Sequence, residues 1–331
     1  MHTRGNLLDV VDLNVVFYTY RGVIKALNGV ELWMNRGERL GIVGETGCGK
    51  SVTSKAIMGL IEDPGEIRNG EIVFEDRNLL HLKEKEMRQI RGNEIAMIFQ
   101  EPNSSLNPVM NVGFQIAEVL ARKNKTRIKK QYNAVAEILD FVGLDAERVM
   151  DMYPHELSGG MAQRVMIAMG LAPRPKLLIA DEPTSALDVT IQAQILGLLD
   201  ELVSEMGNAV MMITHDMGVV AEFCDKILVM YAGNSVEYAP ITKLFKNPAH
   251  PYTKGLLQAV PRIGRTEELK AIAGTVPDLV APPSGCRFHH RCPQAMDICA
   301  RRKPTFSELE ENHFVACYLY ENGKDGENND C

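Results

Sequence analysis

A glycine-rich loop near residue 44 constrains the fold of this chain more than any other feature. Glu38–Val43 has the pattern of a short buried strand, Gly44–Ser51 follows with the pattern G-x-x-x-x-G-K-S, and Lys50–Ile61 has the pattern of a helix. Glycines let successive backbone N–H groups converge on one anion, and a helix start adds the positive end of its dipole. A strand, this loop and a helix in that order predict a phosphate-binding site.

Each position of this loop is a candidate contact to a nucleotide. In sites of this kind the lysine pairs with the β- and γ-phosphates and the hydroxyl residue binds Mg²⁺, which assigns these roles to Lys50 and Ser51. Cys48 is expected to contribute its backbone rather than its thiol. The predicted nucleotide-binding residues of the loop are Gly44, Glu45, Thr46, Gly47, Cys48, Gly49, Lys50, Ser51 and Val52.

A second catalytic element is expected where the apolar strand Leu177–Ala180 ends in two carboxylates, Asp181 and Glu182. Asp181 is placed to bind Mg²⁺, directly or through water. Glu182 lies one residue further on, where it can accept a proton from an attacking water. Adjacent carboxylates at a turn are usually solvated surface charges, but the buried strand before them and the loop at residue 44 favour the catalytic interpretation.

Strand and helix patterns alternate along the rest of the chain. Residues 8–17 and 23–34 alternate apolar and polar side chains, which predicts half-buried antiparallel strands. Further strands are expected at 70–74, 95–99, 177–180, 209–214 and 226–231, and helices at 82–91 and 189–206. The expected fold is α/β, a RecA-like P-loop NTPase core with an antiparallel β subdomain, a helical subdomain inserted at about 107–173, and a small cysteine-rich C-terminal extension.

Composition limits the function classes. The chain has 331 residues and a net charge of −7, so the whole molecule gives no electrostatic support to a nucleic-acid partner. The sequence shows neither an apolar run of membrane-spanning length nor a secretory signal, which makes the cytoplasm the default compartment. A shift in composition after Pro240 predicts a nucleotide-binding domain at 1–240 and a regulatory or metal-binding C-terminal extension at 241–331.

The segment Leu157–Arg164, with the sequence LSGGMAQR, decides between classes of NTPase. Ser158 is expected to cap a helix that runs from Gly159 to about Ala172. The free N–H groups at the start of this helix then face outward toward an anion. This segment resembles the LSGGQ signature of the ABC ATPase family. In that family the signature of one subunit completes the ATP site of a second subunit, which implies nucleotide contacts for Ser158, Gly159 and Gly160. The usual signature glutamine is Met161 here.

Other motifs match that family in order. Gln100 resembles the glutamine that reaches Mg²⁺ and the attacking water, and His215 resembles the histidine that contacts the γ-phosphate. Ser185–Asp188 resembles the loop at the dimer seam, and Tyr20, or alternatively Tyr18, is the expected aromatic for stacking on adenine. The resemblance therefore implies catalytic and Mg²⁺-binding residues as follows: Glu182, His215 and Gln100 for catalysis; Ser51, Gln100 and Asp181 for Mg²⁺; and Tyr20 and Asp188 for nucleotide binding.

Three segments of the tail, residues 247–257, 274–279 and 282–293, resemble ATPases that serve dipeptide, oligopeptide and nickel importers. The resemblance implies an ATP-hydrolysing subunit that energises peptide import, with nickel or another small solute as the alternative cargo. A soluble ABC ATPase acting on nucleic acid or ribosomes is the competing class. The implied partners are a second ATPase subunit (a different chain, or alternatively a second copy), two permease subunits and an external binding protein, on the cytoplasmic face of a prokaryotic cell membrane.

Four cysteines gather in the tail, separated by five, six and seventeen residues: Cys286, Cys292, Cys299 and Cys317. Clustered thiolates in a cytoplasmic protein suggest a metal centre, but these spacings lack the C-x-x-C pairs of a zinc ribbon. Relatives in this importer branch carry a [4Fe–4S] centre on such a tail, which is the favoured interpretation. Zinc, with help from His250, His289 or His290, disulfides and free thiols are the alternatives. Cys224 is expected in the core and Cys331 as a free terminal thiol.

Overall fold

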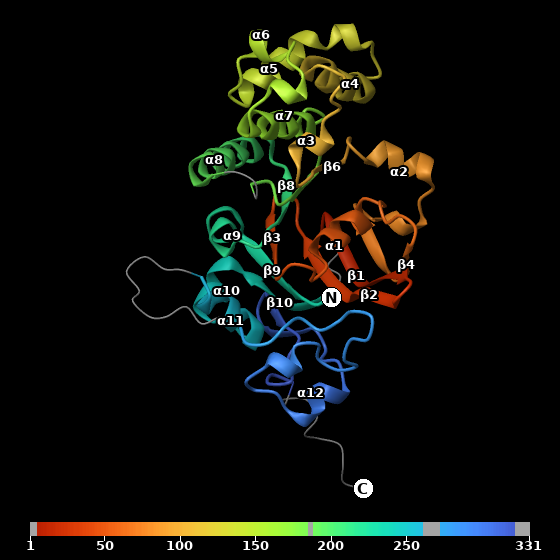
Figure 1. Cartoon of the computed structure of the whole chain (residues 1–331), viewed down its shortest axis with the longest axis vertical. Coiled ribbons are helices and arrows are strands. Elements are labelled where there is room, and N and C mark those ends of the chain that lie inside the picture. The colour runs from red at the N-terminus through yellow and green to blue at the C-terminus, as the bar shows by residue number, and fades with distance from the viewer. Residues whose placement is uncertain (1–4, 185–187, 261–271, 322–331) are drawn as a thin grey trace. The chain divides into compact units, whose positions relative to one another are not determined.

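The computed structural model describes residues 5–184, 188–260 and 272–321 (Figure 1). The chain divides into two compact units. The first unit contains Met1–Met34, Leu40–Leu80 and His215–Cys331, and the second contains Asn35–Arg39 and His81–Thr214. None of the described helices combines the length and the apolar composition needed to cross a membrane.

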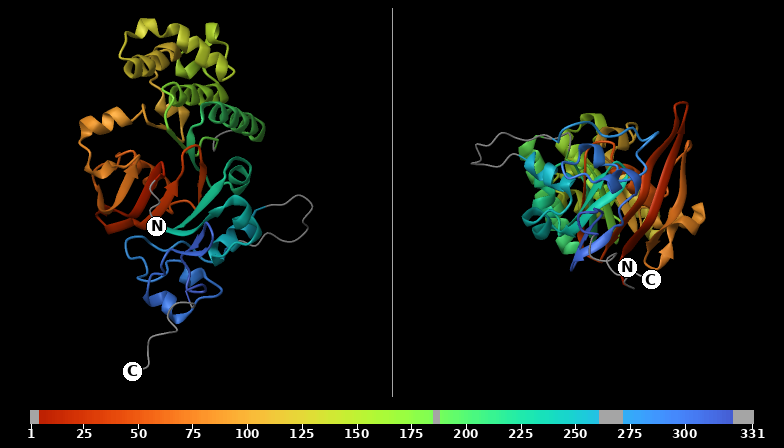
Figure 2. Two further views of the ribbon diagram at one scale, coloured as in Figure 1. Left: turned by 180° about the vertical axis from the view of Figure 1, so that it is seen from behind. Right: turned by 90° about the horizontal axis from the view of Figure 1, so that it is seen from below.

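The first unit contains a four-stranded antiparallel sheet in the order β2-β1-β4-β5. Its longest members are β1 (Leu8–Thr19) and β2 (Gly22–Met34), which form the long hairpin drawn in red in Figure 2. β4 (Gly65–Phe74) and the two-residue β5 (Arg77–Asn78) complete the sheet. Alternate residues of β1 are buried, because side chains of a strand point to opposite faces. The prediction of antiparallel strands at 8–17 and 23–34 is confirmed.

The first unit also holds five strands in the order β11-β12-β10-β9-β3. β3 (Arg39–Val43) pairs in parallel with β9 (Lys226–Tyr231), and both are almost entirely buried, as parallel strands covered on both faces are. β10 (Asn234–Pro240) runs antiparallel to β9. The helices of this unit are α1 (Lys50–Ile57), α9 (Met217–Phe223), α10 (Ile241–Lys246), α11 (Pro251–Gln258) and α12 (Asp297–Arg301).

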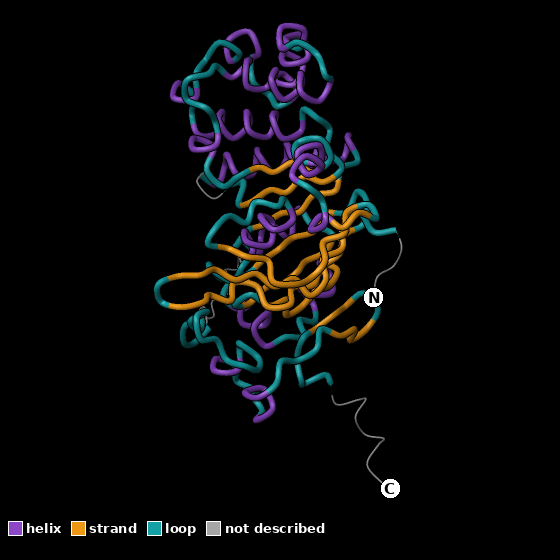
Figure 3. The backbone as a smooth tube through the Cα atoms, turned by 90° about the vertical axis from the view of Figure 1, so that its right-hand side faces the viewer, coloured by secondary structure: helices purple, strands orange, loops and turns teal. Residues whose placement is uncertain are grey.

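The second unit combines three parallel strands with helices. β6 (Ile95–Ile98), β7 (Leu177–Asp181) and β8 (Ala209–Ile213) pair in that order, and the residues of β7 and β8 are all buried. The helices α2 (Glu84–Ile90), α3 (Pro102–Ser105) and α8 (Val189–Met206) belong to the same unit. The expected α-helical subdomain consists of α4 (Val112–Asn124), α5 (Tyr132–Phe141), α6 (Ala146–Val149) and α7 (Gly159–Leu171), the purple helices near the top of Figure 3.

Helix α1 is shorter than its apolar pattern predicts, because it ends at Ile57 instead of Ile61. Gly59 has a φ of +61°, its N–H donates to the carbonyl of Ala56, and the N–H of Leu60 donates to the carbonyl of Lys55. This pair of hydrogen bonds around a left-handed glycine is the Schellman arrangement that closes a helix. Gly59 therefore ends the helix, although the apolar residues around it fit a longer helix.

The C-terminal extension adds strands to the sheet that contains β9 and β10, which its composition did not predict. β12 (His313–Val315) pairs antiparallel with β10, with Glu237 opposite Val315, and β11 (Ser307–Glu310) pairs with β12. The first unit therefore extends the β9–β10 hairpin with two strands from the tail. The two strands fix the tail to the core through backbone hydrogen bonds.

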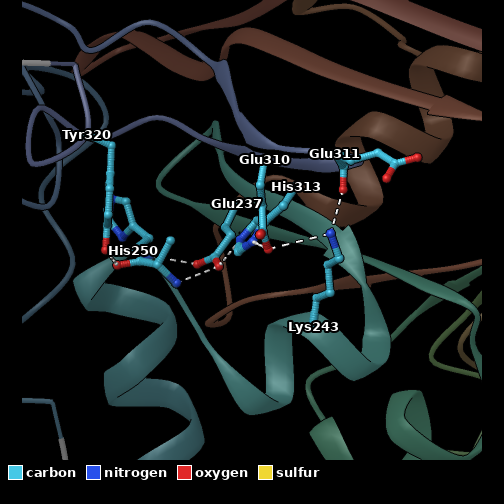
Figure 4. A network of polar contacts seen from close by, with 8 residues as sticks. Glu237, Lys243, His250, Glu310, Glu311, His313 and Tyr320 are labelled. Atoms are coloured by element: carbon cyan, nitrogen blue, oxygen red, sulfur yellow. Dashed lines mark hydrogen bonds and ion pairs between the residues drawn. The ribbon is translucent and has the colours of Figure 1, made fainter. Parts of the chain in front are cut away.

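A buried carboxylate strengthens this junction (Figure 4). Glu237 on β10 is fully buried and accepts hydrogen bonds from the backbone N–H groups of Ala249 and His250, at 2.7 and 2.8 Å. Its Oε1 also lies 2.8 Å from Nε2 of His313 on β12. Nearby, the hydroxyl of Tyr320 donates to the carbonyl of Ala249 at 3.1 Å. A buried charge is tolerated only when it is paired and hydrogen-bonded, and these donors satisfy that condition.

Glu237 and His313 shift each other's pKa. Burial alone would raise the pKa of Glu237, but the hydrogen bonds from His313 and the two backbone amides bring it below its ordinary value. Burial alone would lower the pKa of His313, but the hydrogen bond and negative charge of Glu237 raise it above its ordinary value of 6.5. The charged form of both side chains is therefore favoured in the folded protein.

The raised pKa of His313 makes the stability of this junction depend on pH. The ion-pair contribution is fully present below the ordinary histidine pKa of about 6.5 and is lost as the pH rises through the higher folded-state value. We expect His313→Gln to lower the free energy of unfolding by about 1–3 kcal/mol near pH 6. The difference from the wild type should shrink as the pH rises to about 9.

Thermal unfolding followed by circular dichroism across this pH range measures the effect. Removal of the exposed histidine at position 155 (His155→Gln) is a matched control. If the destabilisation by His313→Gln were the same at both ends of the range, the ion pair would not be its cause.

Candidate functional site

The glycine-rich loop joins β3 to α1 in the first unit, as the sequence predicts. Gly44 has a φ of +155°, and a Cβ at this position would lie 2.2 Å from the carbonyl oxygen of Met230 on β9. Gly49 has a φ of +106°, and a Cβ there would lie 2.6 Å from Cδ2 of Leu27. Only glycine adopts this backbone at so close an approach, so the sequence of the loop fixes its path against the sheet.

Lys50 crosses the loop from the first residue of α1. Its side chain is buried, and Nζ donates to the carbonyl oxygens of Gly44 at 2.7 Å and of Glu45 at 3.4 Å. In the part of the chain that the structure describes, no side chain caps the start of α1, whose N-cap residue is Gly49. An ammonium group beside uncapped helix N–H groups is an arrangement that binds a phosphate.

Cys48 contacts the rest of the first unit through its backbone and buries its thiol. Its carbonyl accepts from the N–H of Gly233 at 2.8 Å, and its side chain is buried. Burial raises the pKa of the Cys48 thiol, which keeps it protonated at neutral pH. These observations argue against a reactive thiol at this position.

Glu45, the second residue of the loop, contacts the C-terminal extension. Its N–H donates to the hydroxyl of Tyr252 on α11 at 2.9 Å, and its carboxylate forms an ion pair with Arg291 at 2.8 Å. No local pattern in the sequence predicts these contacts, because the paired residues are separated by more than 200 positions.

In the second unit, the end of β7 carries the two predicted carboxylates. Asp181 is buried in the strand, and Glu182 follows with a φ of +47°, which is uncommon for a residue with a long side chain. The N–H of Glu182 donates to the carbonyl of Ile213 on β8 at 2.8 Å. Nε2 of Gln100, just after β6, donates to Oε2 of Glu182 at 2.9 Å. The structure therefore brings together Gln100 and Glu182, two of the three predicted catalytic residues.

The signature segment has the local structure that the sequence predicts. Ser158 is the N-cap of α7, its Oγ accepts from the N–H of Met161 at 3.3 Å, and α7 runs from Gly159 to Leu171. Ser158 and Gly159 are exposed, and Gly160 is partly exposed. An exposed helix start with a serine cap can receive an anion from outside the chain.

Asp188 has a structural contact that its resemblance to the dimer-seam loop does not predict. Its Oδ1 accepts from the N–H groups of Thr190 at 3.1 Å and Ile191 at 3.0 Å, so it is the N-cap of α8. The other residues of this predicted loop, 185–187, lie outside the described residues. A nucleotide contact for Asp188 stays a prediction.

Two further predicted residues belong to the first unit. His215 is exposed and follows β8 in the chain, next to Asp216, which caps α9. Tyr20 lies in the turn between β1 and β2 and is 99% exposed. The hydroxyl of Tyr18, the alternative, donates to Oε2 of Glu66 at 2.7 Å. Tyr20 is thus the more accessible of the two rings for stacking on a base, and both roles stay predictions.

The four tail cysteines come together in the first unit. Cys286, Cys292, Cys299 and Cys317 all line one small cavity. Burial raises the pKa of Cys286 to about 12 and that of Cys317 to about 11, with smaller contributions from the neighbouring cysteines. Cys224 is buried in the core, as expected. Cys331 lies outside the described residues.

The metal prediction is not confirmed by this arrangement. Among the described residues, no group of three or more His, Cys, Asp or Glu side chains is arranged to hold a single metal ion. The predicted zinc ligand His250 already serves another purpose, since its Nδ1 accepts from the N–H of Tyr252 at 3.1 Å as the N-cap of α11. His289 Nδ1 lies 2.7 Å from the carbonyl of Cys286, and its ring lies against that of His290.

Comparison with known families matches both parts of the chain. Residues 27–185 match the model of the ABC transporter family, and residues 236–299 match that of the oligopeptide/dipeptide transporter C-terminal region. A probable peptide ABC transporter ATP-binding protein of Sinorhizobium fredii is 52% identical over 94% of this chain and 94% of its own length. The oligopeptide transport ATP-binding protein OppD of Salmonella typhimurium is 49% identical over 94% of this chain and 93% of its own length.

Solved structures agree with this assignment. A dimeric bacterial ABC transporter cassette superposes with a TM-score of 0.63 at 29% identity, covering 71% of this chain and 98% of the other. The same ATP-binding cassette in a post-hydrolysis state bound to ADP and Pi superposes with a TM-score of 0.64 at 28% identity. The glycine-rich loop, the carboxylate pair and the capped signature helix agree with these matches. The matches show that the chain belongs to the ATP-binding proteins of ABC transporters, in the oligopeptide and dipeptide transport branch.

Proposed function

We propose that this chain binds ATP at the loop Gly44–Ser51 and hydrolyses it to energise the import of dipeptides or oligopeptides. The observation that carries the proposal is the buried ammonium of Lys50, held inside the glycine loop at the start of an uncapped helix. The names of the relatives, which refer to peptide transport, favour peptides over nickel or another small solute as cargo. The net charge of −7 argues against the alternative of a nucleic-acid substrate.

The proposed roles follow the chemistry of each side chain. Lys50 pairs with the β- and γ-phosphates, and the backbone of the loop surrounds them. Ser51, Asp181 and Gln100 would hold Mg²⁺, which neutralises the phosphate charge. Glu182 accepts the proton of the attacking water, and the hydrogen bond from Gln100 orients its carboxylate.

The remaining predicted contacts complete the nucleotide site in this proposal. His215 contacts the γ-phosphate, and Tyr20 stacks on the base. Ser158, Gly159 and Gly160 present the exposed start of α7 to the nucleotide of a second subunit, as does Asp188 at the start of α8. The dimeric state of the similar cassette supports such a shared site.

The proposed assembly has a second ATPase subunit, a pair of permease subunits and, indirectly, an external binding protein. We favour a different chain over a second copy as the ATPase partner. The assembly places this chain at the cytoplasmic face of a prokaryotic membrane, bound to its permease. We keep the division into a nucleotide-binding domain at 1–240 and a C-terminal extension at 241–331 as part of the proposal.

We also propose a [4Fe–4S] cluster at the four tail cysteines. The support is that Cys286, Cys292, Cys299 and Cys317 line one cavity although 30 residues of sequence lie between the first and the last. Iron–sulfur clusters are held by four cysteine thiolates spread around a core larger than one ion. Bound iron would also account for four cysteines in one place, because burial raises the pKa of Cys286, Cys292 and Cys317 and makes their thiolates unfavourable without a metal.

Glu182→Gln tests the proposed proton acceptor. Glutamine keeps the size and the hydrogen bonding of the side chain but cannot accept the proton, so the rate of ATP hydrolysis should fall by about 10²–10⁴-fold. ATP binding should stay within about threefold of the wild type, because the phosphate contacts are unchanged. The variant should also accumulate closed, ATP-bound dimers.

Single-turnover hydrolysis and equilibrium binding, measured on the full-length chain with its partner subunits, separate these effects. Glu201→Gln, which changes an exposed glutamate of α8 in the same way, is the control. Normal hydrolysis by Glu182→Gln would show that the general base is another group.

Iron and sulfide analysis of anaerobically purified protein tests the cluster. We expect about four iron and four sulfide ions per chain, with broad visible absorbance. Cys299→Ser should lose most of this iron, whereas Cys224→Ser, at a buried cysteine outside the cavity, should keep it. Stoichiometric zinc without iron in the wild type would establish the alternative metal.

A further inference from the structure

The C-terminal extension holds the second residue of the phosphate loop from two sides. Arg291 ends the short 3₁₀ turn His289–Arg291 and forms two hydrogen bonds to the Glu45 carboxylate, from Nη1 to Oε2 at 2.8 Å and from Nη2 to Oε1 at 3.2 Å. The Arg291 side chain is 7% exposed and that of Glu45 is 27% exposed. A two-point guanidinium–carboxylate pair shielded from water is stronger and more directional than a surface ion pair.

The guanidinium itself is fixed by further acceptors. Nε of Arg291 donates to the carbonyl of Ala273 at 2.9 Å, and Nη2 donates to the carbonyl of Ile272 at 3.2 Å. Nη1 lies 3.3 Å from the hydroxyl of Tyr231 at the end of β9. These acceptors hold the planar fork of Arg291 in the orientation that pairs with Glu45, which reduces the side-chain entropy lost in the pairing.

The second contact is to the backbone of the loop. The hydroxyl of Tyr252 accepts from the N–H of Glu45 at 2.9 Å, and this tyrosine is fully buried. Its ring packs against those of Tyr231 and Phe288, with centroids 4.6 and 5.3 Å away. Glu45 is thus held through both its backbone and its side chain, on a rigid aromatic support.

These contacts have two consequences for a polyphosphate bound at the loop. Glycine-rich backbones sample many conformations, so fixing Glu45 lowers the entropy cost of closing the loop around phosphates. Glu45 is also a negative charge within the loop, and the guanidinium of Arg291 compensates it. Without Arg291, the carboxylate would repel the incoming nucleotide.

We propose that Arg291 is a positioning residue for nucleotide binding, through which the C-terminal extension sets the affinity of the phosphate loop for ATP. The inference rests on the proposed ATP site at Gly44–Ser51. The β10–β12 pairing and the Glu237–His313 pair already attach the extension to the core at other residues. The Arg291–Glu45 pair therefore adds an attachment directly at the nucleotide loop.

A double-mutant cycle tests the proposal, with the dissociation constant of a fluorescent ATP analogue measured on the full-length chain. Arg291→Ala leaves an uncompensated carboxylate in the loop and should weaken binding by about tenfold. Glu45→Gln removes that charge and should cost less, about threefold or under. In the double variant Glu45→Gln with Arg291→Ala, binding should return to within about threefold of the wild type, because the repulsion is gone.

Two variants separate positioning from general damage to the fold. Arg291→Lys keeps the charge but cannot make the two-point pair, so its affinity should lie between those of the wild type and Arg291→Ala. Arg301→Ala removes an exposed arginine of α12 in the same extension and should bind the analogue as the wild type does. If Arg291→Ala does not fold, Arg291→Lys and Glu45→Gln complete the same test through smaller changes.

The outcomes separate a failure of the role of Arg291 from a failure of the proposed ATP site. Wild-type affinity in both Arg291→Ala and Arg291→Lys, or strictly additive losses in the double variant, would overturn the positioning role. If Lys50→Ala bound the analogue as tightly as the wild type, the ATP site itself would be misplaced. Rescue by Glu45→Gln in the absence of Arg291 is the result that a purely structural role for Arg291 does not produce.

Discussion

The buried ammonium of Lys50 is the interaction on which the functional interpretation of this chain depends. Its Nζ is taken out of water and donates to two backbone carbonyls of its own loop, at Gly44 and Glu45. Carbonyl oxygens carry partial charges, so they stabilise a full positive charge less well than an anion does. This arrangement is the one that the proposed phosphate site requires, and the close approach of Gly44 to the carbonyl of Met230 fixes the path of the loop against the sheet.

The C-terminal extension contacts the glycine-rich loop and also forms the cavity that the four cysteines line. One junction is a strand pairing reinforced by the buried Glu237 and His313, and it attaches the tail to β10. A second junction, through Arg291 and Tyr252, reaches the phosphate loop at Glu45. Arg291 directly precedes Cys292, which lines the four-cysteine cavity, so one short turn of the tail takes part in both places. The extension is thus attached to the loop of the proposed nucleotide site as well as to β10.

Features with a local cause were predictable from the sequence. The glycine loop, the alternating strands β1 and β2, the serine cap of α7 and the helix at 189–206 each depend on residues a few positions apart. The early end of α1 was a local signal too, but Gly59 was overlooked within an apolar run. Strand pairing of the tail with β10 and the pairing of Glu45 with Arg291 join distant residues, and no periodicity encodes which residue meets which. The sequence predicted that the four tail cysteines lie close together. Their spacing in the sequence does not specify which metal they would bind.

The most direct test of the central claim is hydrogen–deuterium exchange at residues 44–51 of the full-length chain, with and without MgATP. If the loop receives the phosphates, its backbone N–H groups become hydrogen-bonded and its exchange should slow markedly on addition of MgATP, an effect that Lys50→Ala should abolish. Protection by MgATP elsewhere in the chain, with unchanged exchange at 44–51, would contradict the account.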